Sequence, residues 1–392
     1  MRWPAKRISE SSKKSFGMYE KAAKLMEAGA DLIHLEVGRP NFDTPLHIKE
    51  ATKKALDDGL VHYGSFFGEL KFREALAEKL SRYNNINASV DEIVVTGGLT
   101  HGAYAACMAA IDPGDEVILL EPYYPQHINK IELAGGKVVT AALNRDEAFS
   151  IDPLAIKEKI NENTRMIVLV NPANPTGRVY SREELQVLAD IAIENDLLVM
   201  SDEVYEQILY DGNQHISIAS LPGMQERTIS LFAFTKGYAM DGWRMGYAVA
   251  QRNLMEAILK ITVNDMAHVN VFIQEGGYAA ISGSQNCVEE MVAEDKRRRD
   301  LVCSRLNAMP NIVCEAPDAT IYAFPDIRQT GYSSQALAEK ILEECQVVVE
   351  AGSFYGAAGE GYLRVCFGAE PYERIAEAMD RMEKFFVSLA QS

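Results

Sequence analysis

Apolar runs of strand length alternate with helix-like segments through the middle of the chain. The runs Met166 to Val170, Leu197 to Met200 and Ile229 to Phe232 are almost wholly apolar. Between the first two, Ser181 and Glu184 form a capping-box pattern that opens a segment with apolar residues at helical spacing. Continuous apolar strands that alternate with helices are typical of parallel sheets covered on both faces. The pattern therefore predicts an α/β fold.

Polar residues follow each of these three runs. The first run leads into N-P-A-N-P-T-G, the second into S-D-E-V-Y, and the third into F-A-F-T-K-G. The carboxyl ends of parallel strands meet at one edge of a sheet, and ligands of open α/β sheets bind at that edge. We therefore expect Asn174, Asp202, Tyr205 and Lys236 to lie close together.

The residue types at this edge suit one cofactor. A lysine amine attacks an aldehyde when it is neutral, so the pKa of Lys236 must fall through loss of water or a nearby cation, which Arg244 could provide. Asp202 could hold the nitrogen of a pyridine ring, and Asn174 and Tyr205 could donate to a ring oxygen. Together these groups are what pyridoxal 5'-phosphate requires. Taken alone, the lysine segment would be read as a solvated turn, because lysines after strands are common and usually solvated.

The motifs, in this order and spacing, resemble those of fold-type I, pyridoxal-phosphate-dependent aminotransferases of class I/II, the group similar to aspartate and aromatic aminotransferases. The resemblance covers nearly the whole chain. It implies that Lys236 is the Schiff-base lysine and Asp202 the ring-nitrogen partner. It also implies that Asn174 and Tyr205 are the ring-oxygen partners and that Arg244 binds the cofactor phosphate.

A phosphate site is predicted where a strand runs through a glycine pair into an Ala-rich segment, at residues 92–111. Backbone N–H groups at the start of a helix bind phosphate. Gly98, Leu99 and Thr100 match the phosphate cup of the family, and Thr235 is placed to add a second hydroxyl. A helix start without a ligand is the alternative reading of this segment alone.

Substrate-binding residues are expected from both ends of the chain. Gly38 matches the family residue that lies against the substrate carboxylate, and Asn174 is expected to contact the substrate as well. Arg364 lies within the apolar run Y-L-R-V-C-F. A guanidinium in such a run is costly unless it is paired, and a substrate carboxylate is a natural bidentate partner. A structural salt bridge is the alternative.

Three tyrosines match family positions. Tyr124 matches the aromatic residue that stacks on the pyridine ring, with its neighbour Tyr123 as the alternative. Tyr63 matches a tyrosine that reaches the cofactor phosphate of the neighbouring subunit. The resemblance thus implies a homodimer, although a tyrosine buried in an interface is an alternative for Tyr63.

Some positions depart from the family pattern. Ala233 stands where the family often has serine. Arg39 stands where many relatives carry glutamate, so it could favour acidic substrates or pair with a surface acid. Phe16, Gly17 and Met18 are expected to line the cleft.

The resemblance implies two domains. We expect a large domain at residues 46–288, with a mostly parallel, seven-stranded-type sheet between helices. A smaller α+β domain should combine residues 1–45 and 289–392. Its predicted helices are Ser334 to Cys345 and Pro371 to Leu389.

The composition of the chain limits the kinds of molecule that it is expected to bind. The chain has 392 residues, 47% of them hydrophobic, and a net charge of −17, which argues against nucleic acid and anionic membranes. The six cysteines form no C-x2-C pair, so neither a metal site nor a disulfide framework is expected. No apolar stretch reaches membrane-spanning length and no secretory signal is evident, so a cytoplasmic location is predicted. The charge run at residues 296–300 is interpreted as a solvated helix face.

The predicted function is transfer of the amino group of an L-amino acid to a 2-oxo acid. An acidic or aromatic donor is expected, with 2-oxoglutarate as acceptor, and Lys236 would be both the Schiff-base residue and the acid/base. A β-lyase or a cyclopropane-forming synthase would use the same cofactor residues. A non-catalytic cofactor-binding or regulatory protein is the alternative from a different class.

Overall fold

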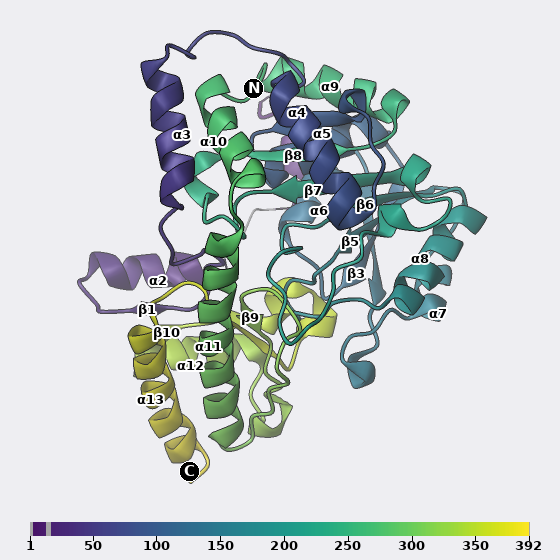
Figure 1. The fold of residues 1–392 in the computed structure, drawn as a ribbon. Helices are drawn as coiled ribbons and strands as arrows, with labels where there is room; N and C mark the ends of the chain where they lie inside the picture. The colour runs from purple at the N-terminus through teal and green to yellow at the C-terminus, as the bar shows by residue number, and fades with distance from the viewer. Residues whose placement is uncertain (1–2, 13–16, 392) are drawn as a thin grey trace.

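A computed structural model describes residues 3–12 and 17–391. Within these residues, seven strands form one sheet in the order β2-β8-β7-β6-β5-β3-β4 (Figure 1). Strand β8 is antiparallel to both of its neighbours, and the other pairs in the sheet are parallel. In chain order the strands are β2 (Ile93–Thr96), β3 (Glu116–Glu121), β4 (Lys137–Ala142), β5 (Thr164–Val170), β6 (Leu198–Asp202), β7 (Thr228–Ala233) and β8 (Gly246–Val249).

The three predicted strands are confirmed as β5, β6 and β7, with ends that differ from the predicted ones by at most two residues. Their side chains alternate between two apolar layers. In β5, Met166 and Val168 pack into one core cluster, and Ile167 and Leu169 pack into another. Burial on both faces explains why these strands read as continuous apolar runs.

Helices cover both faces of the sheet. One face is packed against α5, α6 and α9, and the other against α7 and α8 at one end and α3, α4 and α10 at the other. The capping box is present at the start of α8: Ser181 accepts from the N–H of Glu184, whose carboxylate accepts from the N–H of Ser181. The helices are α3 (Leu46–Asp57), α4 (Leu70–Lys79), α5 (Leu99–Ala110), α6 (Gln126–Leu133), α7 (Pro153–Lys157), α8 (Arg182–Glu194), α9 (Arg252–Asp265) and α10 (Val271–Ser282).

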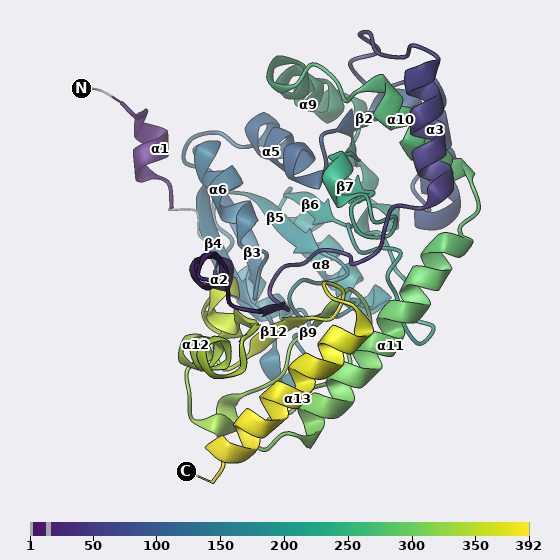
Figure 2. The same ribbon diagram turned by 90° about the vertical axis from the view of Figure 1, so that its left-hand side faces the viewer.

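The two ends of the chain pack together in a second region. A parallel pair joins β1 to β10, and an antiparallel sheet has the order β11-β12-β9. Figure 2 shows α2 beside α12, and α13 beside α11. The strands are β1 (Ile33–His34), β9 (Tyr322–Ala323), β10 (Val347–Val348), β11 (Glu350–Ala351) and β12 (Leu363–Cys366), and the helices are α2 (Met18–Glu27), α11 (Asn286–Ala308), α12 (Ser334–Cys345) and α13 (Tyr372–Leu389). Helix α1 (Lys6–Glu10) lies apart from this region and contacts α6 (Figure 2).

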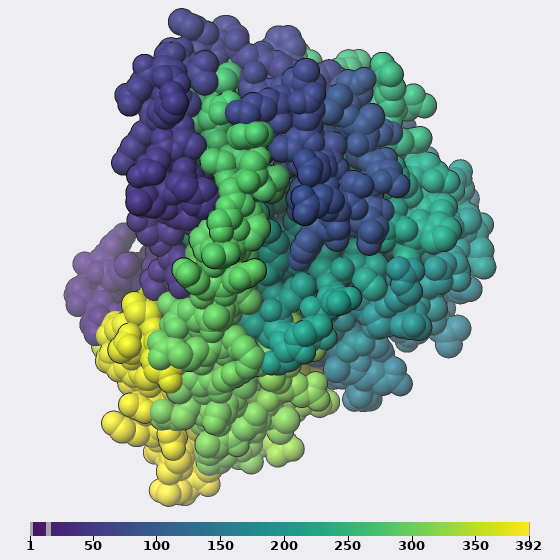
Figure 3. Space-filling view, viewed as in Figure 1, coloured from purple at the N-terminus to yellow at the C-terminus, as the bar shows by residue number. Residues whose placement is uncertain are grey.

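The predicted helices of the C-terminal segment are therefore confirmed as α12 and α13. The domain boundaries at residues 45/46 and 288/289 stay a prediction. Helix α11 crosses the second of them without interruption and reaches from the sheet region to the C-terminal region along the face shown in Figure 3.

The prediction that residues 296–300 form a solvated face is wrong for two of its arginines. The side chains of Arg298 and Arg299 are 5% and 4% exposed. Arg298 lies 4.7 Å from the centre of the Phe42 ring. Arg299 lies 4.7 Å from the Tyr210 ring and pairs with Asp211 at 2.6 Å. Aromatic faces and a carboxylate offset the loss of water at these guanidinium groups.

In the part of the chain that the structure describes, no helix is both long and apolar enough to cross a membrane. The six cysteines are free thiols, and five of them are buried.

Candidate active site

A cavity of about 630 Å³ opens at the carboxyl edge of the sheet, where the second region meets it. Most of the predicted site residues line this cavity. These are Gly38, Leu99, Thr100, Tyr124, Asn174, Asp202, Tyr205, Thr235, Lys236, Arg244 and Arg364, together with Arg39. Leu99, Thr100, Tyr124, Asn174, Asp202, Tyr205, Thr235 and Lys236 follow or end strands of the seven-stranded sheet, as the sequence predicts, and Arg244 lies just before β8. Gly38, Arg39 and Arg364 come from the second region.

Lys236 lies in the connection between β7 and β8 and is partly buried. Its Nζ donates to the carbonyl oxygen of Gly38 and lies 5.8 Å from the centre of the Tyr205 ring. The pKa of Lys236 is lowered to about 8, chiefly by removal from water and also by the guanidinium of Arg364, whereas Cys366 acts in the opposite direction. The predicted fall in pKa is thus confirmed, but the contributing cation is Arg364 rather than Arg244.

The lowered pKa of Lys236 leads to a prediction that can be tested on the protein without cofactor. Neutral amines react with acylating reagents, so acylation of Lys236 should rise with pH and reach half its maximum near pH 8. An ordinary lysine would be neutral in roughly one chain in 250 at that pH. Quantitative mass spectrometry of the Lys236 peptide against pH tests this, with the exposed Lys137 as the internal control. A midpoint for Lys236 equal to that of Lys137 would contradict it.

Asp202 ends β6 and has a buried partner that the sequence did not reveal. His127 Nε2 lies 3.2 Å from Asp202 Oδ2, and the ring of Tyr124 packs edge-on against His127 at 5.4 Å. Burial lowers the pKa of His127, so the ring is neutral. Because a carboxylate accepts hydrogen bonds, the proton of this imidazole belongs on Nε2. His127 lies within α6, where no motif marks it.

His127 should support activity through Asp202. We expect His127→Ala to lower kcat/KM by about tenfold, which corresponds to the loss of a hydrogen bond to a charged group. His127→Gln, which keeps an N–H donor, should recover part of the loss. Steady-state kinetics of the two variants checks this, and equal losses in both would argue against the hydrogen bond as the cause.

Arg364 lies on β12 with its guanidinium in the cavity wall. Its Nη1 donates to Asn174 Oδ1 at 3.1 Å, and its Nη2 donates to the carbonyl oxygen of Glu36. The guanidinium carbon lies 4.3 and 5.0 Å from the ring centres of Tyr322 and Tyr355. Among the described residues, Arg364 Nε is buried without a hydrogen-bond partner. The side chain is therefore held rigidly, and the second N–H of each Nη, rather than the buried Nε, is left for a carboxylate.

Two tyrosines lie behind this arginine. The hydroxyl oxygens of Tyr205 and Tyr322 are 2.6 Å apart, and burial raises the pKa of Tyr322 to about 12 and that of Tyr205 still higher. Both hydroxyls are therefore protonated near neutral pH. Gly38 packs closely against this pair, because a Cβ atom at position 38 would lie 1.9 Å from the Tyr322 hydroxyl. No sequence motif marked Tyr322.

The start of α5 forms an anion cradle with Arg244. Gly98 has a φ of 85°, and a Cβ atom there would lie 2.6 Å from Arg244 Nη2. Leu99 and Thr100 in the first turn of α5, Thr235 and Arg244 all line the cavity. Backbone N–H groups, hydroxyls and a guanidinium suit a phosphate. With a lysine and a carboxylate nearby, the donor set fits pyridoxal 5'-phosphate.

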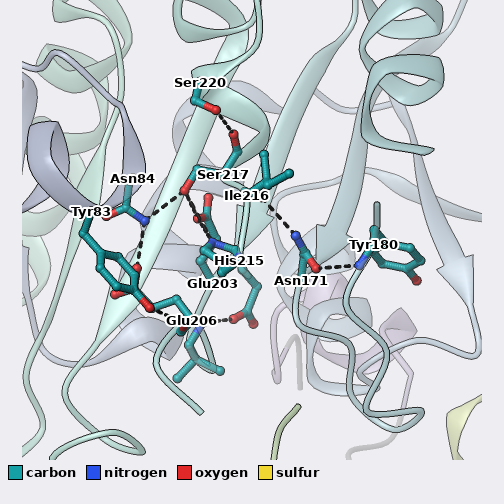
Figure 4. A network of polar contacts seen from close by, with 12 residues as sticks. Tyr83, Asn84, Asn171, Tyr180, Glu203, Glu206, His215, Ile216, Ser217 and Ser220 are labelled. Atoms are coloured by element: carbon teal, nitrogen blue, oxygen red, sulfur yellow. Dashed lines mark hydrogen bonds and ion pairs between the residues drawn. The ribbon is translucent and has the colours of Figure 1, made fainter. Parts of the chain in front are cut away.

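A buried polar network lies behind the two loops that deliver the cavity residues (Figure 4). Glu203, which directly follows the cavity aspartate, accepts from Ser217 Oγ and lies 2.7 Å from His215 Nε2. Asn171, three residues before the cavity asparagine, donates to the carbonyl oxygen of Ile216 at 3.1 Å. The segment 215–217 thus ties both loops together.

Some predicted residues lie elsewhere. The side chain of Tyr63 is 89% exposed and does not line the cavity. Met18 is buried in the core of the second region, so the expectation that it lines the cleft is wrong, and Phe16 lies outside the described residues. From the same helix, Tyr19 and Met26 line the cavity instead.

Of the two candidate stacking residues, Tyr124 faces the cavity. Tyr123 packs against the sheet core. Across residues 3–12 and 17–391, no cluster of three or more His, Cys, Asp or Glu side chains could hold a metal ion.

The fold and the cavity bring a lysine of lowered pKa, a helix start with Arg244 and the buried Arg364 together in one cleft. The chain belongs to the family Aminotransferase class I and II, whose model matches residues 30–382. It is 42% identical to an aspartate aminotransferase of Pyrococcus abyssi, over 90% of this chain and 91% of that protein. It is 40% identical to aromatic-amino-acid aminotransferase 2 of Thermococcus litoralis, with the same coverage.

A solved structure agrees with these relatives. The aromatic aminotransferase from Pyrococcus horikoshii OT3 superposes with a TM-score of 0.90 at 40% identity, covering 95% of this chain and all of that one. The predicted α/β fold and the predicted aminotransferase class are therefore confirmed, and the enzyme is a transaminase.

Proposed function

We propose that the enzyme transfers the amino group of an acidic or aromatic L-amino acid to 2-oxoglutarate, with pyridoxal 5'-phosphate bound through Lys236. The observation that carries this proposal is the lysine itself: an amine of lowered pKa in a cleft that the start of α5, Arg244 and the buried Arg364 also line. The relatives act on aspartate or aromatic amino acids by their names, which supports the choice of donors.

Each cavity residue then has a defined task toward the cofactor. Gly98, Leu99, Thr100 and Thr235 would hold the phosphate with Arg244. Asp202 would hold the ring nitrogen, and its bond to His127 fixes the direction of the carboxylate. Asn174 and Tyr205 would donate to the ring oxygen, and Tyr124 would cover the ring face. When bound, the cofactor supplies an electron sink for the charge left at the substrate α carbon.

Other residues act on the substrate. Arg364 would bind the α-carboxylate with its free donor edge, and Asn174, which accepts from Arg364, would keep that edge in place. Gly38 leaves room for the carboxylate beside Tyr322. The amine of Lys236, of which about half is neutral at pH 8, would remove the α proton and hold it for return to the product.

The first experiment is a spectral titration of the holoenzyme. Each amino acid is added in turn, and the absorbance of the bound cofactor is recorded before and after addition of 2-oxoglutarate. A change caused by aspartate or by an aromatic amino acid, and reversed by 2-oxoglutarate, would support the proposal and identify the donor.

Other results would reject it. Release of pyruvate and ammonia without any oxo acid would identify a β-lyase. A cofactor spectrum that no amino acid changes would indicate an amine substrate that is not an amino acid, or a regulatory role.

The assembly proposed for the enzyme is a homodimer. The Tyr63 side chain is almost fully exposed in the single chain, as expected for a residue that reaches a neighbouring subunit. Sedimentation equilibrium should give twice the mass of 43.4 kDa. Tyr63→Phe should weaken cofactor retention in that dimer. The cytoplasmic location stays a prediction.

A further inference from the structure

A buried acid, Glu350, lies opposite the carboxylate-binding arginine. The antiparallel pairing of β11 with β12 places Glu350 directly across from Arg364. Residues at such positions have Cβ atoms about 5 Å apart on one face of the sheet. Both line the cavity, and the two residues are 3% and 7% exposed. The acid is therefore a neighbour of the group expected to bind the substrate carboxylate.

The carboxylate of Glu350 nevertheless has other partners. The N–H of Met18, the first residue of α2, donates to both carboxylate oxygens at 3.3 and 3.0 Å, and the N–H of Ala351 donates at 3.0 Å. Within the described residues, these bonds take the place of an ion pair between Glu350 and Arg364. A helix N-terminus favours a negative charge, so α2 holds the carboxylate away from the guanidinium.

The start of α2 is built closely around this carboxylate. A Cβ atom on Gly17 would lie 2.0 Å from Glu350 Oε2, so a side chain at position 17 would displace the acid. The Met18 side chain is fully buried in the core of the second region, and Lys21 pairs with Glu339 of α12. Helix α2 therefore docks on the second region at the same point where it meets Glu350.

We propose that Glu350 is a positioning residue that makes carboxylate binding at Arg364 depend on the docking of helix α2. When α2 is docked, the N–H of Met18 donates to the Glu350 carboxylate. The guanidinium N–H groups of Arg364 then stay available for a substrate carboxylate. When that N–H is removed, the acid turns to the guanidinium across the strand pair and occupies the donors that the substrate needs. This inference rests on the proposed role of Arg364.

Backbone substitution at Met18 tests the inference directly. Met18→Pro removes the N–H at the first helical position, where proline is well tolerated. Met18→Ala keeps the N–H and also loses the methionine side chain, so it is the matched control. The readout is the Kd of 3-phenylpropionate, a carboxylate without an amino group, measured by calorimetry on the holoenzyme at pH 8. Met18→Pro should bind at least about tenfold more weakly than Met18→Ala.

Removal of the acid should rescue the loss. In the double variant Met18→Pro with Glu350→Gln, the neutral amide cannot neutralise Arg364, so the Kd should return to within about threefold of Met18→Ala. Equal affinity of Met18→Pro and Met18→Ala, or a double variant without rescue, would overturn the inference. If Arg364→Ala leaves the wild-type Kd unchanged, the proposed role of Arg364 has failed instead.

The surface pair of α2 gives a second test that leaves the core intact. Lys21→Glu replaces the pairing of α2 with Glu339 by repulsion, so docking weakens. It should raise the Kd by about threefold, and adding Glu350→Gln should remove that rise. A rise that persists in the double variant would overturn the inference.

The pH dependence gives a further check on the same variants. Burial raises the pKa of Glu350 to about 7, with Arg364 acting against that rise and Glu36 adding to it, while the N–H groups of Met18 and Ala351 favour the ionised form. In Met18→Pro an ion pair with Arg364 would lower the pKa of Glu350 below this value. The difference between Met18→Pro and Met18→Ala should therefore be present at pH 8 and should shrink as the pH falls below 7 and the acid takes up a proton. A difference that stays constant throughout that fall would contradict a role for the charged acid.

Discussion

Replacing Lys236 with alanine should lower kcat by at least about 10⁴-fold. The variant loses both the covalent attachment of the cofactor and the amine that moves the α proton. It should keep part of its cofactor affinity, because the cradle of Gly98, Thr100 and Arg244 is unchanged. Steady-state kinetics and the absorbance of bound cofactor measure the two effects separately.

Lys137→Ala is the control for this variant, because its amine pairs with Glu116 at the surface and should leave kcat unchanged. Borohydride reduction of the wild-type holoenzyme should fix the cofactor to the peptide that contains Lys236. Near-normal turnover by Lys236→Ala, or attachment at another lysine, would reject the assigned role.

Replacing Arg364 with alanine should lower kcat/KM by about 10²- to 10³-fold, mainly through KM. The change removes one partner of a buried, hydrogen-bonded charge pair, which costs about 2–5 kcal/mol, and each tenfold corresponds to 1.4 kcal/mol. It also leaves the Asn174 side-chain oxygen without its guanidinium donor. The kcat/KM of Arg364→Lys should lie between that of Arg364→Ala and that of the wild type. Lysine keeps the positive charge but lacks the planar guanidinium with its two parallel donors. Kinetics with aspartate and with phenylalanine measure the effect.

Arg328→Ala serves as the matched control, since Arg328 pairs with Asp326 away from the cavity. The structural alternative for Arg364 predicts a different outcome. If the residue merely stabilises the fold, Arg364→Ala should lower the melting temperature and leave KM near the wild-type value.

Much of the fold could be predicted because its signals are local. The strands β5, β6 and β7 are buried on both faces, so each is a short apolar run, and a polar motif follows each one. Parallel strand order then places Asn174, Asp202 and Lys236 at one edge. The helix start at α8 was equally local, because its capping box spans four residues.

The residues that the sequence did not reveal depend on contacts between distant segments. His127 reaches Asp202 from α6, Tyr322 reaches Tyr205 from β9, and Glu350 reaches Met18 from β11. None of these residues lies in a recognisable motif. Each was singled out only by its contact with a residue that is distant in the sequence. The burial of Arg299 is of the same kind, because its charge looks solvated until Tyr210 and Asp211 are placed beside it.

The reversed direction of β8 bears on how the site tolerates change. Because β8 returns antiparallel to β7, the connection between them begins and ends at the same edge of the sheet. This single loop carries both Lys236 and Arg244, whereas Thr100, Asn174 and Asp202 arrive from separate strands. An insertion at the start of the loop would therefore shift the Lys236 amine and the Arg244 guanidinium together. An insertion in another loop at that edge would move only the cavity residues that this loop carries. We therefore expect residues 234–245 to be the part of the edge that tolerates a change in length least.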